Sequence, residues 1–147
     1  MRERLVGNQQ PVIPTVTFDE LYQKAKSVTH PRKLSAEADA GGVGAAILAE
    51  SGKVYTGVCI DTACSMGFCV EHAAAAAMIT AGESRVLKMI AVGSDGQIMP
   101  PWGRCREFIS QIHNENLNTE VMVAEGVVAT LRELLPHDWR KPALASS

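Results

Sequence analysis

The sequence has 147 residues, of which 46% are hydrophobic, enough to bury one apolar core but too few for two ordinary domains. We predict a single domain over residues 1–147, with flexible tails at 1–15 and 141–147. The net charge of −2, with acidic and basic residues interspersed, excludes the strongly basic surface of nucleic-acid binders and favours a small-molecule ligand. Apolar runs fall short of the roughly 20 residues that cross a membrane, and the N-terminus lacks the hydrophobic stretch of a secretion signal. We therefore expect a cytoplasmic protein that contacts neither membrane nor nucleic acid.

Four cysteines are present, at Cys59, Cys64, Cys69 and Cys105, and three of them fall within one short stretch. In a chain without a secretion signal this pattern indicates reduced thiols rather than disulfides. A single cysteine there is either a small core residue or a chemically active one. The residues around each cysteine must decide between the two.

The first predicted element is a helix that begins after Thr17, because Thr17 and Glu20 have the spacing of a capping box. A loop over 30–42, containing Gly41 and Gly42, should border the site. Strands at 43–49 and 54–60 then form a hairpin.

The alanine-rich segment Cys69 to Ala81 predicts a second helix, which ends before Gly82. Further along the chain we expect a strand at 86–92, a helix at 104–113, strands at 121–124 and 126–129, and a short helix at 131–135. This alternation predicts an α/β fold, with helices on both faces of a mixed sheet of about five strands.

The string Cys69-Val70-Glu71-His72 places a thiol and a carboxyl group at the start of the second helix. A helix N-terminus favours a thiolate and hence metal binding. Cys105 lies near the start of the 104–113 helix, so two thiolates could share one zinc ion if the helices pack side by side. Glu71 could then move protons for a metal-activated water. The alternative is a capping glutamate with two buried cysteines, and the local pattern alone does not choose between them.

Five segments, in the same order along the chain, resemble motifs of the cytidine and blasticidin S deaminases. They are Val43-Gly44-Ala45-Ala46, Tyr55-Thr56-Gly57-Val58, Cys69-Val70-Glu71-His72-Ala73-Ala74, Pro101-Trp102-Gly103-Arg104-Cys105-Arg106 and Glu133-Leu134-Leu135-Pro136. The resemblance runs from about the first helix to Trp139 and covers the two segments that correspond to the zinc-binding signature known for this class of deaminase.

This resemblance implies a three-layer α/β/α fold and one Zn²⁺ per chain, with Cys69 and Cys105 as ligands and Glu71 as the proton shuttle. It places Asp61, beside Cys59, where the family contacts the sugar hydroxyls. Trp139 falls where family members stack an aromatic ring on the base, often from a neighbouring subunit of a tetramer, although ordinary packing explains such a residue equally well.

The implied activity is that of a hydrolase acting on a cyclic amidine C–N bond, in a cytosine nucleoside or a related aminopyrimidine such as blasticidin S. The resemblance further implies a place in pyrimidine salvage and a homotetrameric assembly.

Trp102 departs from the family pattern, because it occupies the first cysteine of the P-C-x-x-C motif and its indole cannot bind zinc. One of three protein ligands is therefore missing. Cys64, Cys59 and His72 are candidate replacements, of which Cys64 is favoured by reach, although an ordinary buried thiol is the stronger expectation for it. His72 lies about 100° around the helix from Glu71, so it is expected to point away from the metal if Glu71 points toward it.

Two departures affect the substrate pocket. Cys59 replaces the asparagine that binds ribose in the family, and a thiol is a poor hydrogen-bonding partner. Gly41 and Gly42 stand where many cytidine deaminases carry an aromatic residue that flanks the base. Recognition of sugar and base should therefore differ from that of an ordinary cytidine deaminase.

Four hypotheses follow. The first is a zinc-dependent hydrolytic deaminase, and the second is a metal-poor homologue that binds a ligand or partner without turnover. In the third, Trp102 is an engineered or accidental change in an ordinary enzyme; in the fourth, the α/β domain has unrelated chemistry. The zinc site requires the sulfurs of Cys69 and Cys105 to lie roughly 4 Å apart.

Overall fold

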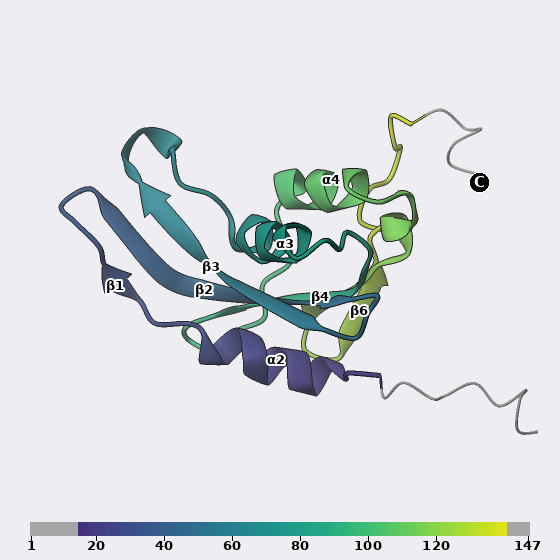
Figure 1. Ribbon diagram of the computed structural model, residues 1–147, viewed down its shortest axis with the longest axis horizontal. Coiled ribbons are helices and arrows are strands. Elements are labelled where there is room, and N and C mark those ends of the chain that lie inside the picture. The colour runs from purple at the N-terminus through teal and green to yellow at the C-terminus, as the bar shows by residue number, and fades with distance from the viewer. Residues whose placement is uncertain (1–14, 141–147) are drawn as a thin grey trace, which may run out of the picture.

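A computed structural model of the chain describes residues 15–140, so the predicted tails, apart from Thr15, lie outside the described residues. A mixed sheet forms the middle layer, with one helix on one face and two on the other (Figure 1). This arrangement confirms the predicted three-layer α/β/α fold. Among residues 15–140 no helix has both the length and the apolar character needed to cross a bilayer.

Helix α2 (Phe18–Ser27) covers one face of the sheet and begins at the predicted capping box. The amide of Glu20 donates to the Thr17 hydroxyl at 3.2 Å, and the amide of Thr17 donates to the Glu20 carboxylate at 3.0 Å. Leu21 and Ala25 are fully buried against the apolar residues of β2 and β4 (Ala46, Leu48, Ile90 and Val92).

The sheet, as far as residues 15–140 show, has six strands, and β2 pairs with three of the others. Its strands are β1 (Arg32–Lys33), β2 (Ala38–Ala49), β3 (Val54–Thr62), β4 (Val86–Gly93), β5 (Glu120–Ala124) and β6 (Val127–Thr130). Strand β3 pairs antiparallel with one edge of β2, whereas β1 and β4 pair antiparallel with successive parts of the other edge. The pairing of β4 with β5 is parallel and that of β5 with β6 antiparallel.

The predicted loop over 30–42 is partly wrong, because it contains β1 and the beginning of β2. The glycine pair marks a register shift between Ala40 and Gly44 rather than the end of a loop. Gly41 has φ +87, and a Cβ there would lie 2.2 Å from the carbonyl oxygen of His30, so the bulge requires glycine. On the far side of this bulge, the start of β2 pairs with β1 and with the end of β3. This pairing depends on residues distant in the sequence, so the local pattern did not predict it.

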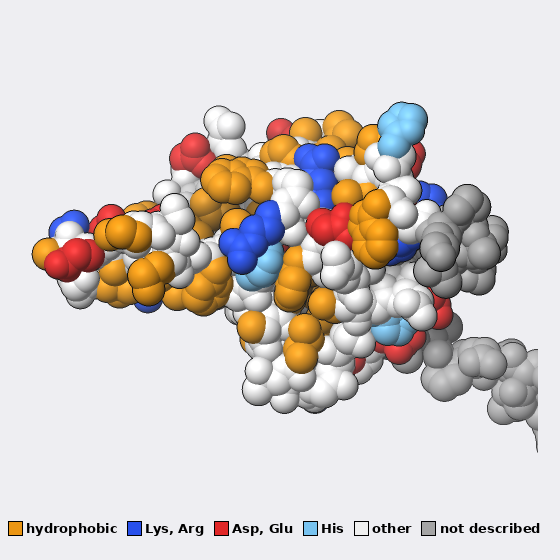
Figure 2. Space-filling view, turned by 90° about the horizontal axis from the view of Figure 1, so that it is seen from above, with side chains coloured by type: hydrophobic (Ala, Val, Ile, Leu, Met, Phe, Trp, Pro, Cys, Tyr) orange, Lys and Arg blue, Asp and Glu red, His pale blue; other side chains and the backbone are white. Residues whose placement is uncertain are grey.

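Beyond the bulge, β1, the start of β2, the end of β3 and the short 3₁₀ helix η1 (Ala63–Ser65) project from the body as an arm (Figure 1). Figure 2 shows hydrophobic side chains gathered along this arm. Leu34 and Met66, on or beside the arm, are exposed. From the arm the chain returns to the sheet and enters α3.

Helices α3 (Val70–Thr80) and α4 (Gly103–Gln111) cover the other face, and η2 (Asn114–Asn118) leads from α4 to β5. The predicted helices at 69–81 and 104–113 are thus confirmed with small shifts at their ends. The expected short helix at 131–135 is wrong: the segment forms turns in which the amide of Leu134 donates to Leu131. Five residues before a proline are too few to stabilise a helix by themselves.

Gly57 of β3 lets α3 lie directly on the sheet. A Cβ at this position would lie 2.4 Å from the amide nitrogen of Ala74 and 2.7 Å from the Cβ of Ala73. Because both neighbours belong to the first turns of α3, Gly57 sets the height of that end of the helix above β3.

The Gly57→Ala variant should therefore be destabilised by about 1–3 kcal/mol, since the added methyl group must push α3 away from the sheet. Chemical denaturation measures this change. Gly103→Ala is the matched control, because beyond its chain neighbours and the backbone of its own helix nothing lies within 4 Å of the corresponding Cβ position. Equal unfolding midpoints for Gly57→Ala and the unmodified protein would contradict the close packing described here.

Candidate metal centre and active site

The first turns of α3 and α4 bring the predicted site residues together. Cys69 is the N-cap of α3 and His72 is its third residue, while Trp102 and Cys105 hold the same two positions in α4. Side chains at the N-cap and at the third helical residue reach toward each other, as they do in a capping box. Each helix therefore presents a pair of neighbouring side chains at its N-terminus.

Cys69, His72 and Cys105 form a cluster in which the potential ligand atoms all lie within 4.8 Å of one another. The Nδ1 atom of His72 lies 3.6 Å from the Sγ atom of Cys105. Ligands of a tetrahedral zinc ion with bonds near 2.0–2.3 Å are separated by about 4 Å. Two thiols and an imidazole at this spacing are a donor set that suits zinc, so the residues present fit the metal.

The expectation that His72 points away from this cluster is wrong. That expectation took the direction of the His72 side chain relative to Glu71. The relevant neighbour is Cys69, which lies three residues earlier and on the same side of the helix. The imidazole also stacks on the Phe108 ring of α4, with ring centroids 4.2 Å apart and planes 20° from parallel. The Cys-x-x-His spacing at a predicted helix start was the sequence signal for this residue.

The two cysteines considered as replacement ligands lie outside the cluster. Cys64, which was favoured by reach, lies in η1, where its φ of 60 turns the chain at the end of the arm. The expectation of a buried thiol is also wrong, because Cys64 is exposed there. Cys59 is half-buried in β3. Within residues 15–140 the cluster therefore takes its third potential ligand from α3 itself.

A cavity of about 460 Å³ opens beside the cluster, and five of the six predicted site residues line it: Cys59, Asp61, Cys69, Glu71 and Cys105. Glu71 is only 4% exposed, so its carboxyl group belongs to the buried wall. The exposed side chains of Phe68, Trp102 and Arg104 also line the cavity and thus lie toward its opening.

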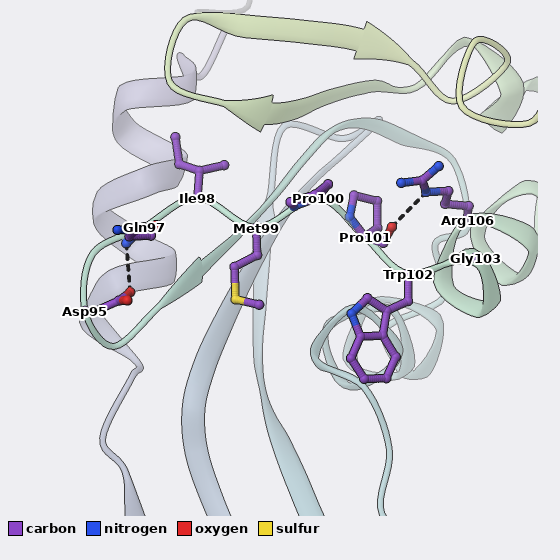
Figure 3. Close-up of a pocket in the computed structure, with 9 residues that line it drawn as sticks. All are labelled: Asp95, Gln97, Ile98, Met99, Pro100, Pro101, Trp102, Gly103 and Arg106. Carbon is purple, nitrogen blue, oxygen red and sulfur yellow. Dashed lines mark hydrogen bonds between the residues drawn. The ribbon is translucent and has the colours of Figure 1, made fainter.

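Trp102 also lines a second cavity of about 590 Å³, shown in Figure 3. Its indole is 71% exposed where the loop enters α4. In this loop the Nε–H of Arg106 donates to the carbonyl oxygen of Pro101 at 2.7 Å, and its Nη1 donates to Leu134 at 3.3 Å. Arg106 thus ties together the Pro101–Arg106 and Glu133–Pro136 motifs, a role that the sequence analysis did not identify.

Burial controls the electrostatics of the site. It raises the pKa of Glu71, although a hydrogen bond with the Cys105 thiol acts in the opposite direction. Burial and the adjacent Glu71 carboxylate raise the pKa of the Cys105 thiol. Burial and the positive charge of Arg104 lower the pKa of His72, which favours the neutral imidazole that a metal requires. A bound cation would reverse the effect on the thiol, because a metal-coordinating thiol loses its proton.

Trp139 is the predicted site residue that does not line the cavity beside the cluster. Its indole N–H donates to the Glu107 carboxylate at 2.9 Å, and the Arg140 guanidinium lies 5.1 Å from the ring centroid. The ring is 69% exposed. Trp139 therefore belongs to the surface around α4, where Glu107 and Arg140 of the same chain contact its ring.

The comparisons with known proteins agree with this geometry. No family model matches the chain. Cytidine deaminase from Sporosarcina psychrophila is 34% identical over 107 residues, which cover 70% of this chain and 78% of that protein. Cytidine deaminase from Mycobacterium tuberculosis is 34% identical over 68 residues, or 46% of this chain, and this match spans about half of that protein (51%).

A solved structure extends the likeness to the fold. The crystal structure of cytidine deaminase from Mycobacterium tuberculosis matches with a TM-score of 0.72 and 25% identity, over 86% of this chain and 99% of that chain. Sequence identity and shared architecture lead to the same assignment. The chain belongs to the cytidine deaminase family.

Proposed function

We propose that this protein is a zinc-dependent hydrolytic deaminase of a cytosine nucleoside or a related aminopyrimidine, with Glu71 as its proton shuttle. The observation that carries the proposal is the position of the Glu71 carboxyl group, buried in the wall of a cavity beside the cluster of Cys69, His72 and Cys105. This cluster supports a metal-dependent enzyme, and it gives no support to the metal-poor homologue that Trp102 suggested.

In the proposed reaction, the oxygen of a water molecule bonds to the ring carbon that carries the amino group. The carbon–nitrogen bond then breaks, ammonia leaves, and a carbonyl oxygen replaces the amino group. Zinc, when bound, would supply the Lewis acid that activates the water. Glu71 would accept a proton from this water at a carboxylate oxygen and deliver protons to the ring nitrogen and to the leaving ammonia.

The Glu71→Gln variant should lose activity, because the amide keeps the size of the side chain but cannot carry the proton. We expect kcat to fall by about 10²- to 10⁴-fold. Ammonia release from cytidine, deoxycytidine and blasticidin S measures the effect, and the zinc content of the variant should stay unchanged. The proposal fails if the zinc-loaded protein releases no more ammonia than Glu71→Gln from any of the three compounds.

We propose that Asp61 and Cys59 contact the sugar. Both line the same cavity as Glu71, and Asp61 is exposed to it on the last part of β3. A carboxylate accepts hydrogen bonds from sugar hydroxyls well, whereas the thiol of Cys59 adds little. Asp61 should therefore contribute most of the sugar recognition.

Asp61→Asn should lower kcat/KM for cytidine by roughly 10-fold or more, in keeping with the loss of a hydrogen bond to a charged group. Turnover of free cytosine, which has no sugar, should change little. Asp19→Asn, on α2 across the sheet, is the matched control. Equal losses with cytidine and cytosine would show that Asp61 does not recognise the sugar.

We further propose a cytoplasmic homotetramer that takes part in pyrimidine salvage, in which Trp139 stacks on the base in a neighbouring subunit. The support for a shared site is the position of Trp139, whose exposed ring lies outside the cavity of its own chain. An aromatic ring at a subunit boundary could cover the base of a nucleoside bound in the site of the neighbouring subunit.

Mixed oligomers of Glu71→Gln and Trp139→Ala chains should be more active than oligomers of either variant alone. In such a mixture some sites combine an intact Glu71 with an intact Trp139 from the neighbouring chain. Ammonia release, with subunit composition checked by native mass spectrometry, measures the recovery. If mixing restores nothing while Trp139→Ala alone is impaired, Trp139 does not act across subunits.

A further inference from the structure

We propose that His72 is the third zinc ligand of this protein, in place of the cysteine that Trp102 has replaced. The inference rests on the proposed zinc-dependent function and names the residues that hold the metal. Two ligands, Cys69 and His72, then come from the first turn of α3, and only Cys105 comes from α4.

The first argument is the arrangement of side chains at the two helix starts. Each helix offers an N-cap residue and a third helical residue at its start. In the P-C-x-x-C motif, cysteines occupy both the N-cap and the third residue of the helix that corresponds to α4. In this chain the N-cap of α4 is Trp102, and only Cys105 remains. The pair in α3 is complete in this chain, because His72 follows Cys69 at the required spacing.

The second argument is the observed geometry. The ligand atoms of all three residues lie within 4.8 Å of one another, and the Nδ1 atom of His72 lies 3.6 Å from the Cys105 sulfur. Stacking on Phe108 fixes the imidazole plane in this position. Ligands oriented by neighbouring groups before the metal arrives bind it more tightly.

The third argument is that His72 can bind the metal without obstructing the reaction. Glu71 lines the cavity, but His72, the next residue, does not. The imidazole therefore contacts the cluster without taking up part of the cavity lining. The space for water and substrate is left to Glu71 and the two thiols.

Trp102 is free of any ligand role in this arrangement. Its indole has no atom suited to zinc, and it is 71% exposed beside two cavities. The exchange also changes the charge of the centre, because a neutral imidazole replaces a thiolate. A centre with one less negative charge should polarise the attacking water more strongly than three thiolates would.

Zinc-edge X-ray absorption of the unmodified protein tests the ligand set directly. We expect two sulfur neighbours at about 2.3 Å and a nitrogen or oxygen shell at about 2.0–2.1 Å that carries the multiple-scattering signature of imidazole. Three sulfur neighbours, or a spectrum without the imidazole signature, would overturn the assignment. This measurement requires no variant and so does not depend on the folding of one.

Variants provide an independent test with zinc affinity as the readout. His72→Ala should weaken zinc binding by more than the roughly 100-fold that removal of an outer-shell partner can cost. His30→Ala, an exposed histidine in the loop after α2, should bind zinc like the unmodified protein. The double variant His72→Ala, Trp102→Cys should regain zinc with three sulfur neighbours. His72→Ala that folds by circular dichroism and keeps its zinc affinity would overturn the proposal.

Failure of this inference can be told apart from failure of the proposed function. A protein that shows the two-sulfur, one-imidazole spectrum but releases no ammonia would retain the ligand assignment and lose the deaminase activity. A protein that deaminates cytidine, but whose zinc ion has three sulfur neighbours, would retain the deaminase activity and lose the assignment of His72 as a ligand.

Discussion

The close contact between α3 and β3 is the constraint on which the site depends. Gly57 has no side chain, so Ala73 and Ala74 rest directly on the strand. The fully buried Ala75 and Met78 anchor the rest of the helix in the core. A helix held this rigidly keeps its N-terminal side chains in fixed positions. A functional site requires such precise placement of its side chains.

Helix α4 is held in place by polar contacts at both of its ends. Near its C-terminus the fully buried Asn116 side chain donates to the carbonyls of Ile109 and Ser84 at 2.9 and 3.0 Å, and accepts from the amide of Val86 at 2.8 Å. Near its N-terminus Arg106 bonds the entering loop and the C-terminal segment. These buried and partly buried contacts, once satisfied, allow few alternative positions for α4, so Cys105 stays beside α3.

Much of the fold could be predicted because its signals are local. The capping box at Thr17, the alanine run of α3 and the order of strands and helices depend on neighbouring residues in the sequence. The arm and its bulge could not be predicted, since they depend on which strand happens to lie beside Ala40. The segment 131–135 has a helix-like sequence, but its length and the proline after it let tertiary contacts decide its form.

The site was predicted in part for the same reason. Cys69, Glu71 and Cys105 stand out through their motifs, and the structure brings them to one cavity wall. His72 was misjudged because its direction was compared with Glu71, although the N-cap residue is the neighbour that matters at a helix start. Trp139 is the exception, because its ring contacts Glu107 and Arg140 on the surface around α4 and does not line that cavity.

The paired helix starts also suggest how a metal centre of this kind can change during evolution. Two side-chain positions stand at the start of each helix, and three of these four residues, Cys69, His72 and Cys105, already cluster within 4.8 Å, as many protein ligands as a catalytic zinc ion needs. A lineage could therefore acquire a histidine at the spare position while all three original ligands were still present. The older cysteine could be lost afterwards, with no generation in which the ion was held by two residues. Redundancy among the four positions would make the ligands individually replaceable and the centre itself durable.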